Sequence, residues 1–174
     1  IPVVELPSVV DQGEIKGTVT EETVNKIIKT LEKSKTNKVI FEIKTEQAVE
    51  KSKIVVEKKS IEALIKAKAN LIIKSVVGKV ELPTKVLEEI NKTASLKSID
   101  VNVAKVPTAS LNAEQKKSVN GADVYSIEMM NGENKISTFA GNKIKISLPY
   151  KLKSGELGEG VFIWYMNDKG VLEK

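Results

Sequence analysis

The 174-residue sequence contains no cysteine, no histidine and no arginine, and all 28 of its basic residues are lysine. Without cysteine the chain has no disulfide, no thiolate metal ligand and no cysteine nucleophile. Without histidine it lacks the commonest general base and the commonest transition-metal ligand. These absences exclude most kinds of catalytic site, and they leave carboxylates as the only plausible catalytic groups.

Aromatic residues are also scarce, at 4% of the chain. Proteins that read base sequence favour the bidentate fork of arginine, and proteins that bind single strands stack bases on aromatic rings. The net charge is +5, but lysines and glutamates alternate along the whole chain, which is typical of a mixed, solvated surface. The sequence therefore predicts no nucleic-acid partner.

No apolar run approaches the roughly 18 residues that a membrane span needs, so no direct membrane insertion is predicted. The chain begins at Ile1 and shows no basic-then-apolar leader. We therefore expect a fragment or a processed product, with any targeting segment outside it. A hydrophobic fraction of 41% and a charged fraction of 29% predict a soluble globular fold of one domain or two small ones.

A pattern of strand, short helix and strand occurs three times between about residues 17 and 106. Thr20 and Ser60 are the predicted N-caps of the first two helices, and Pro83–Thr84 begins the third. Helices this short are marginal alone, so they must be held by packing against a sheet. The apolar positions at helical spacing are Val24, Ile27, Ile28 and Leu31 in the first helix, Ile61, Leu64 and Ile65 in the second, and Val86, Leu87 and Ile90 in the third.

Residues 107–122 form the predicted boundary between two sub-domains, with a one-turn helix at Ala113–Lys117. Residues 123–174 are predicted to be all strand. Asn131-Gly132 indicates a hairpin, residues 161–166 are apolar on both faces and predict a central buried strand, and residues 167–170 predict a turn.

The predicted fold class is α+β, with mostly antiparallel strands, three short helices in the N-terminal part and an all-β C-terminal part. The predicted sub-domains are a strand–helix–strand repeat over residues 1–106 and an all-β unit over residues 107–174. The alternative that both share one core stays open.

Carboxylates give no clear catalytic signal in this sequence. Glu88-Glu89 lies on an amphipathic helix among alternating charges, and a glycosidase needs two carboxylates that flank a cleft. The segment Asn167–Gly170 has too few acidic ligands for calcium, and the glycine-rich loop 155–160 precedes a strand rather than a helix, unlike a phosphate-binding loop. We therefore predict no catalytic residue, no metal site, no cofactor and no enzymatic activity.

Aromatic residues gather late in the chain, and their arrangement allows two interpretations. Phe162 and Trp164 share one strand face, with Tyr165 on the other, and the favoured interpretation places Phe162 and Trp164 in the core. The alternative is an exposed platform that stacks on sugar rings. Under that alternative the ligand-binding residues are Tyr150, Trp164 and Tyr165.

Two C-terminal segments resemble a known module. The stretch Ile144–Tyr150 (IKISLPY), the loop with Gly155 and Glu156, and the stretch Val161–Glu173 (VFIWYMNDKGVLE) resemble a β-rich module of Gram-positive, clostridial-type cell-surface proteins, often found next to S-layer homology repeats. Residues 80–90 look like the repeated strand–helix units of the same family. In relatives we expect a further strand with a His-Phe-Ser-like end. This chain stops at Lys174 without it, which would leave a sheet edge unpaired.

The resemblance implies a non-catalytic structural or interaction module of a secreted, cell-wall-associated bacterial protein, at the extracellular cell surface. The implied partners are neighbouring modules of the same polypeptide and a cell-surface protein or polysaccharide. The alternative function is a carbohydrate-binding module of an extracellular polysaccharide-degrading system, and an enzyme acting through glutamate pairs is the third hypothesis. The resemblance carries over no catalytic residues.

Overall fold

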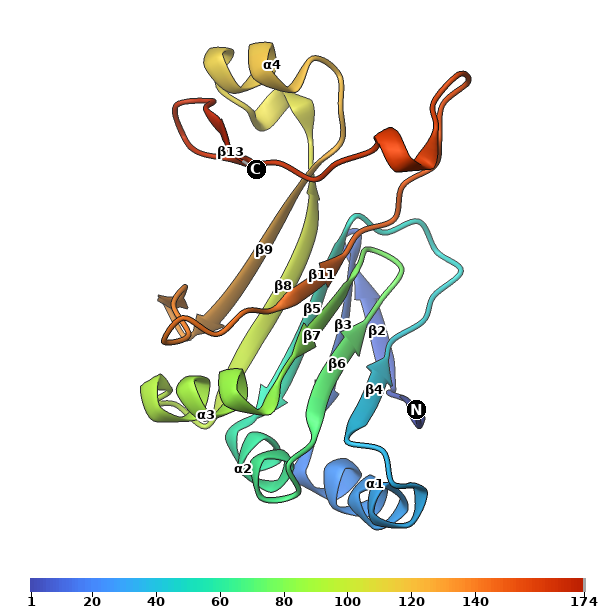
Figure 1. The fold of residues 1–174 in the computed structure, drawn as a ribbon, viewed down its shortest axis with the longest axis vertical. Helices are drawn as coiled ribbons and strands as arrows, with labels where there is room; N and C mark the ends of the chain where they lie inside the picture. The colour runs from blue at the N-terminus through green and yellow to red at the C-terminus, as the bar shows by residue number, and fades with distance from the viewer. Residues whose placement is uncertain (174) are drawn as a thin grey trace.

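Two β-sheets packed face to face form the body of the protein (Figure 1). The computed structural model describes residues 1–173. The five-stranded sheet has the strand order β1-β4-β6-β7-β11, and its strands are β1 (Val3–Glu5), β4 (Lys38–Glu42), β6 (Asn70–Lys74), β7 (Lys79–Leu82) and β11 (Lys145–Ser147).

The six-stranded sheet contains the longest strands and has the order β10-β9-β8-β5-β3-β2. A short ribbon of β12 (Tyr165–Met166) and β13 (Leu172–Glu173) lies apart from both sheets. The strands of the six-stranded sheet are β2 (Ser8–Asp11), β3 (Glu14–Val19), β5 (Lys51–Glu57), β8 (Ser98–Val106), β9 (Val124–Asn131) and β10 (Asn134–Ile136).

Alternating burial along most strands creates the inner faces of the sheets. In β5 and in the first six residues of β8, for example, every second side chain is buried, including Ile54 and Val56 of β5 and Ile99 and Val101 of β8. The sheets approach closely at Gly17, where an added Cβ would lie 2.5 Å from Cγ2 of Ile43. Glycine is therefore required there by the packing of one sheet on the other.

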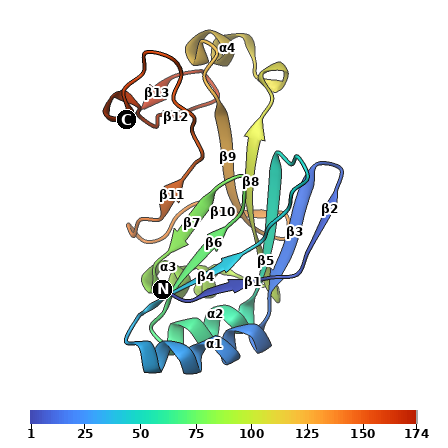
Figure 2. The same ribbon diagram turned by 90° about the vertical axis from the view of Figure 1, so that its right-hand side faces the viewer.

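Three helices close one open end of the sandwich: α1 (Glu21–Ser34), α2 (Lys58–Lys66) and α3 (Thr84–Thr93) (Figures 1 and 2). Each helix connects a strand of one sheet to a strand of the other. The three predicted strand–helix–strand units are thus confirmed, but each unit crosses between the sheets. The helices cover the end of the sandwich rather than a face of a sheet. Their fully buried apolar side chains are Val24, Ile61, Leu64, Val86, Leu87 and Ile90.

The predicted caps had different outcomes. Thr20 is the N-cap of α1, and its hydroxyl accepts a hydrogen bond from the Thr23 amide at 3.2 Å. The Ser60 prediction was wrong, because β5 continues directly into α2 and Glu57 occupies the cap position. Ser60 is buried inside the helix, and its hydroxyl donates to the Val19 carbonyl at 3.0 Å.

The predicted fold class was wrong. The C-terminal part is not all β, because the one-turn helix expected at Ala113–Lys117 is a full fourth helix, α4 (Ala113–Val119). The two large sheets are mixed: most of their strand pairs are antiparallel, as predicted, but β1–β4, β4–β6 and β3–β5 are parallel. The reason is the crossing of the chain between sheets. Since β3 and β5 both lead into a helix at the same end, they run in the same direction, and β4 and β6 both leave that end.

Strands from before and after residue 106 share both sheets. β8 pairs with β9 from Asp100 to Val106, and β11 pairs with β7. Met129 of β9 and Ile136 of β10 belong to the same apolar cluster as the N-terminal strands.

In the described residues, short 3-10 turns occur at η1 (Thr108–Ser110) and η2 (Gly158–Gly160). No helix among these residues is long and apolar enough to cross a membrane.

The central buried strand predicted for residues 161–166 was wrong. Only Tyr165–Met166 is strand, and it pairs with the short β13 alone. Phe162 and Trp164 are 58% and 48% exposed, so the interpretation that places them in the core is also wrong. After β11 the chain leaves the sandwich (Figure 1), and no second sheet is available to cover this stretch among the described residues.

Candidate interaction surfaces

An arm projects from the sandwich at the end opposite α1–α3 (Figure 1). It consists of the far ends of β8 and β9 and of the connection between them, which carries α4. A reciprocal pair of hydrogen bonds begins this helix. The Asn112 side chain accepts from the Gln115 amide at 2.9 Å, and the Gln115 side chain accepts from the Asn112 amide at 3.1 Å. This capping box stabilises the first turn of α4.

The turn at residues 167–170 docks on α4. Asn112 donates its side-chain amide to the Asp168 carbonyl at 2.9 Å, Gln115 donates to the Asn167 carbonyl at 3.4 Å, and the Ser118 hydroxyl donates to the Gly170 carbonyl. The predicted turn is confirmed. Its Asn167 carboxamide oxygen accepts from the amides of residues 169 and 171, both at 3.0 Å.

Gly170 brings this turn into close contact with the helix backbone. Its φ is +74°, and an added Cβ would lie 2.8 Å from the backbone carbon and oxygen of Glu114. Both the left-handed conformation and the close approach require glycine. The sequence predicted a one-turn helix at Ala113–Lys117 and a turn at residues 167–170, but did not indicate that the two meet.

The segment from residue 150 to residue 172, here called the C-terminal segment, exposes most of the protein's accessible apolar side chains. Within residues 1–173 it holds ten of the fifteen exposed large hydrophobic residues. Because large exposed apolar surfaces often mark interaction sites, this segment is a candidate interaction surface. Those ten are Tyr150, Leu152, Leu157, Val161, Phe162, Ile163, Trp164, Tyr165, Val171 and Leu172.

The three predicted ligand-binding aromatics lie at two places on this segment. Tyr150 follows β11, and its hydroxyl donates to Oε2 of Glu156 at 2.7 Å. That hydrogen bond raises the pKa of Tyr150 and lowers the pKa of Glu156. Trp164 and Tyr165 lie at the β12–β13 ribbon, and both are exposed.

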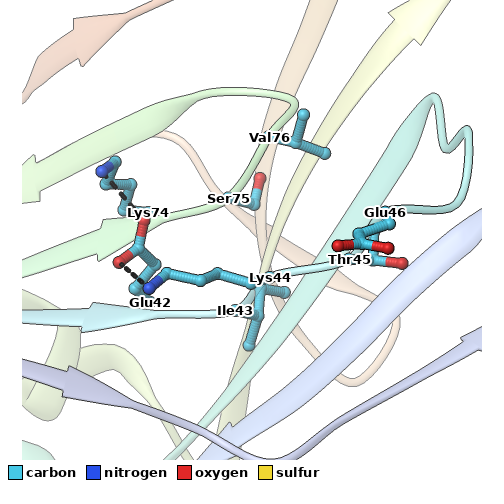
Figure 3. Close-up of a pocket in the computed structure, with 8 residues that line it drawn as sticks. All are labelled: Glu42, Ile43, Lys44, Thr45, Glu46, Lys74, Ser75 and Val76. Atoms are coloured by element: carbon cyan, nitrogen blue, oxygen red, sulfur yellow. Dashed lines mark ion pairs between the residues drawn. The ribbon is translucent and has the colours of Figure 1, made fainter.

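An open hollow of about 520 Å³ lies where the parallel strands β4 and β6 end (Figure 3). On its rim Glu42 forms ion pairs with Lys74 at 2.8 Å and with Lys44 at 3.6 Å, and Lys44 also reaches Glu5 at 3.2 Å. The hydrogen bond from Lys74 lowers the pKa of Glu42, and the hydrogen bond to Glu5 raises the pKa of Lys44. A general acid at neutral pH needs the opposite shift, so Glu42 is held as an ionised structural partner.

The other carboxylates considered from the sequence are solvated. Glu88 is exposed on the surface of α3, and Glu89 pairs with Lys92 at 2.8 Å. Among residues 1–173 no group of three or more acidic, cysteine or histidine side chains converges in a way that could hold a metal ion.

Comparison with models of protein families, with curated proteins and with solved structures finds no match to this chain. The fold and its surfaces define a two-sheet sandwich with one helix-closed end and, at the other end, an arm that anchors an apolar segment. The resemblance to a cell-surface module stays a prediction.

Proposed function

We propose that this chain is a non-catalytic structural and interaction module of a secreted, cell-wall-associated bacterial protein, and that it joins its neighbouring module through the C-terminal segment. One observation carries the proposal. The segment exposes ten large apolar side chains, yet its turn at residues 167–170 is anchored on α4 by specific hydrogen bonds.

Burial of this segment against another protein domain would be energetically favourable. Complete burial of one large apolar side chain contributes about 1.5–3 kcal/mol. Phe162, Ile163 and Tyr165 are 58%, 65% and 65% exposed, so covering the exposed part of these three would contribute about 3–5 kcal/mol. The anchor on α4 restricts the segment before a partner arrives, which reduces the entropy lost on association.

Amide hydrogen exchange tests this proposal directly. The chain is compared alone and within the complete polypeptide that its gene encodes. Amides of residues 157–166 are expected to exchange at least tenfold more slowly in the complete polypeptide, because the neighbouring module covers them. The triple change Phe162→Ser, Ile163→Ser and Tyr165→Ser should abolish that protection.

A matched control uses three exposed apolar residues outside the segment, Val9, Val76 and Leu96, each changed to serine. This control should leave the protection intact. Equal exchange in the isolated chain and the complete polypeptide would contradict the proposed contact. Digestion of intact cells with an external protease tests the location: if the chain resists digestion until the cells are lysed, it does not lie at the surface.

Exposure of Trp164 and Tyr165 favours a second candidate function, carbohydrate binding. The chain has a single tryptophan, so its fluorescence reports on this position alone. Binding of a wall or plant polysaccharide would shift the emission, and Tyr165→Ala would weaken the titration at least tenfold. Unchanged emission across both classes of polysaccharide would exclude this candidate.

A further inference from the structure

The protein's entire net charge resides at its helix-closed end. This helical end comprises α1, α2, α3 and the residues that flank them, including Lys38 at the start of β4 and Glu57 at the end of β5; its ranges are residues 20–38, 57–69 and 83–97. These stretches contain twelve lysines and seven glutamates, a net charge of +5, whereas the rest of the chain contains sixteen lysines and sixteen acidic residues. The net charge of the whole chain is therefore modest, but it is distributed unevenly between the helical end and the rest of the molecule.

The lysines recur at the same spacing on the exposed side of all three helices. Each helix has a lysine pair at positions i and i+7, and every member of these pairs is exposed. Residues seven apart are separated by about 10.5 Å along a helix. α1 packs against α2, and α2 against α3 (Figures 1 and 2), with axes of packed helices about 8–10 Å apart. The pairs are Lys26 and Lys33, Lys59 and Lys66, and Lys85 and Lys92.

Few of these ammonium groups are neutralised locally. Lys26 pairs with Glu22, Lys59 with Glu21 and Lys92 with Glu89. The remaining exposed lysines of the helical end form no ion pair with an acidic side chain among residues 1–173, namely Lys29, Lys33, Lys35, Lys66, Lys68, Lys85 and Lys97. The spacings along and between packed helices, about 8–10.5 Å, are comparable to the Debye length of about 8–10 Å, so cations on neighbouring helices can act together on one long anion.

We infer that the helical end binds an extended, flexible polyanion whose charges are phosphates. Lysine binds phosphate as a point charge. The helical end contains no aromatic residue on which bases could stack. Among the described residues of the helical end, Leu96 is the one large apolar side chain with high exposure. A single exposed leucine provides too little apolar surface for insertion into a lipid membrane. A phosphate polymer without bases fits these properties best.

Inorganic polyphosphate is the probe, titrated against the full chain between 20 and 200 mM salt. The test variant carries Lys29→Gln, Lys66→Gln and Lys85→Gln, one change on each helix. Glutamine has nearly the helix propensity of lysine, and thermal melts of both variants verify folding. The control variant removes three exposed lysines elsewhere that form no described ion pair, Lys51, Lys143 and Lys151.

The test variant should lose at least tenfold in affinity at low salt. Each contact released contributes about 0.7 to the slope of log affinity against log salt for a flexible strand, so the slope should fall by about 2. The control variant should stay within twofold of the native chain, although its net charge is the same as that of the test variant.

Equal losses in the two variants would overturn the inference, because binding would then follow net charge alone. Absence of binding at 20 mM salt would also overturn it. Tighter binding to single-stranded DNA of matched charge, or to anionic vesicles, would assign the surface to a different partner and refute the phosphate polymer. The three helices lie at the opposite end of the molecule from the C-terminal segment (Figure 1). A negative result for polyphosphate binding would therefore leave the hydrogen-exchange test of the proposed function unaffected.

Discussion

Replacing Gly170 by alanine should detach the C-terminal turn from α4 without unfolding the sandwich. Two effects act at this position. The left-handed backbone, with φ at +74°, destabilises an L-residue by about 1–2 kcal/mol. In addition the new Cβ would overlap the backbone of Glu114 at 2.8 Å, and a rigid helix backbone cannot move aside as a flexible side chain can.

Gly155 provides the matched control for this change. Its φ is +85°, and an added Cβ meets no atom within 4 Å. Gly155→Ala therefore introduces the same conformational penalty without the overlap. The difference between the two variants isolates the contact between the turn and α4.

The expected magnitude follows from the three side-chain hydrogen bonds that join α4 to the turn. At about 1 kcal/mol each, their loss corresponds to about 100-fold faster opening of the turn. Amide exchange of residues 165–173 should accelerate by about this factor in Gly170→Ala, while the melting temperature of the sandwich changes little. Equal exchange in Gly170→Ala and Gly155→Ala would refute the proposed anchoring.

Three further predictions concern the sandwich itself. Phe41→Ala removes a fully buried ring from the core and should lower the free energy of unfolding by about 3–5 kcal/mol in urea titrations; a loss below 1 kcal/mol would contradict the assigned packing. Asn131→Ala removes the buried carboxamide that accepts from two amides and donates to a carbonyl, and its unpaired partners should lower the stability by about 2–3 kcal/mol, measured in the same titrations. The pKa of Glu42 is lowered in the folded state by Lys74, so its contribution is present above the unfolded pKa and is lost as pH falls through the folded value. Glu42→Gln should therefore show a smaller drop in melting temperature between pH 7 and about pH 3 than the native chain, and parallel curves for the two proteins would exclude this role.

Local patterns predicted most of the secondary structure in the first 106 residues. The strand around Ile99 and the helix capped by Thr20 followed from alternation, helical spacing and capping chemistry. Prediction was less successful at Ser60, because β5 continues into α2 without a loop and the expected cap became a buried donor to the Val19 carbonyl. It was wrong at residues 161–166, where apolar residues on both faces indicated burial although the chain had already left the sheets.

The candidate surfaces depended still more on long-range contacts. The lysines, aromatic residues and glycines of these surfaces can be read from the sequence. Which of them lie close together in the folded chain cannot. Gly170 reaches α4 across more than fifty residues. The lysines of three separate helices lie at the same end of the sandwich only because α1, α2 and α3 close that end.

Within the first 106 residues, the amino-acid sequence by itself determined most of the segments that are strands or helices and which side of each is apolar, since these depend on neighbours a few residues away. It also determined the narrow chemistry available to a chain without cysteine, histidine or arginine. The tertiary structure alone decided that each helix crosses from one sheet to the other, that strands such as β3 and β5 run parallel, and that the charge collects at one end. These features depend on which surfaces, distant in the sequence, pack against one another. The spacing of residues within a single segment does not specify that packing.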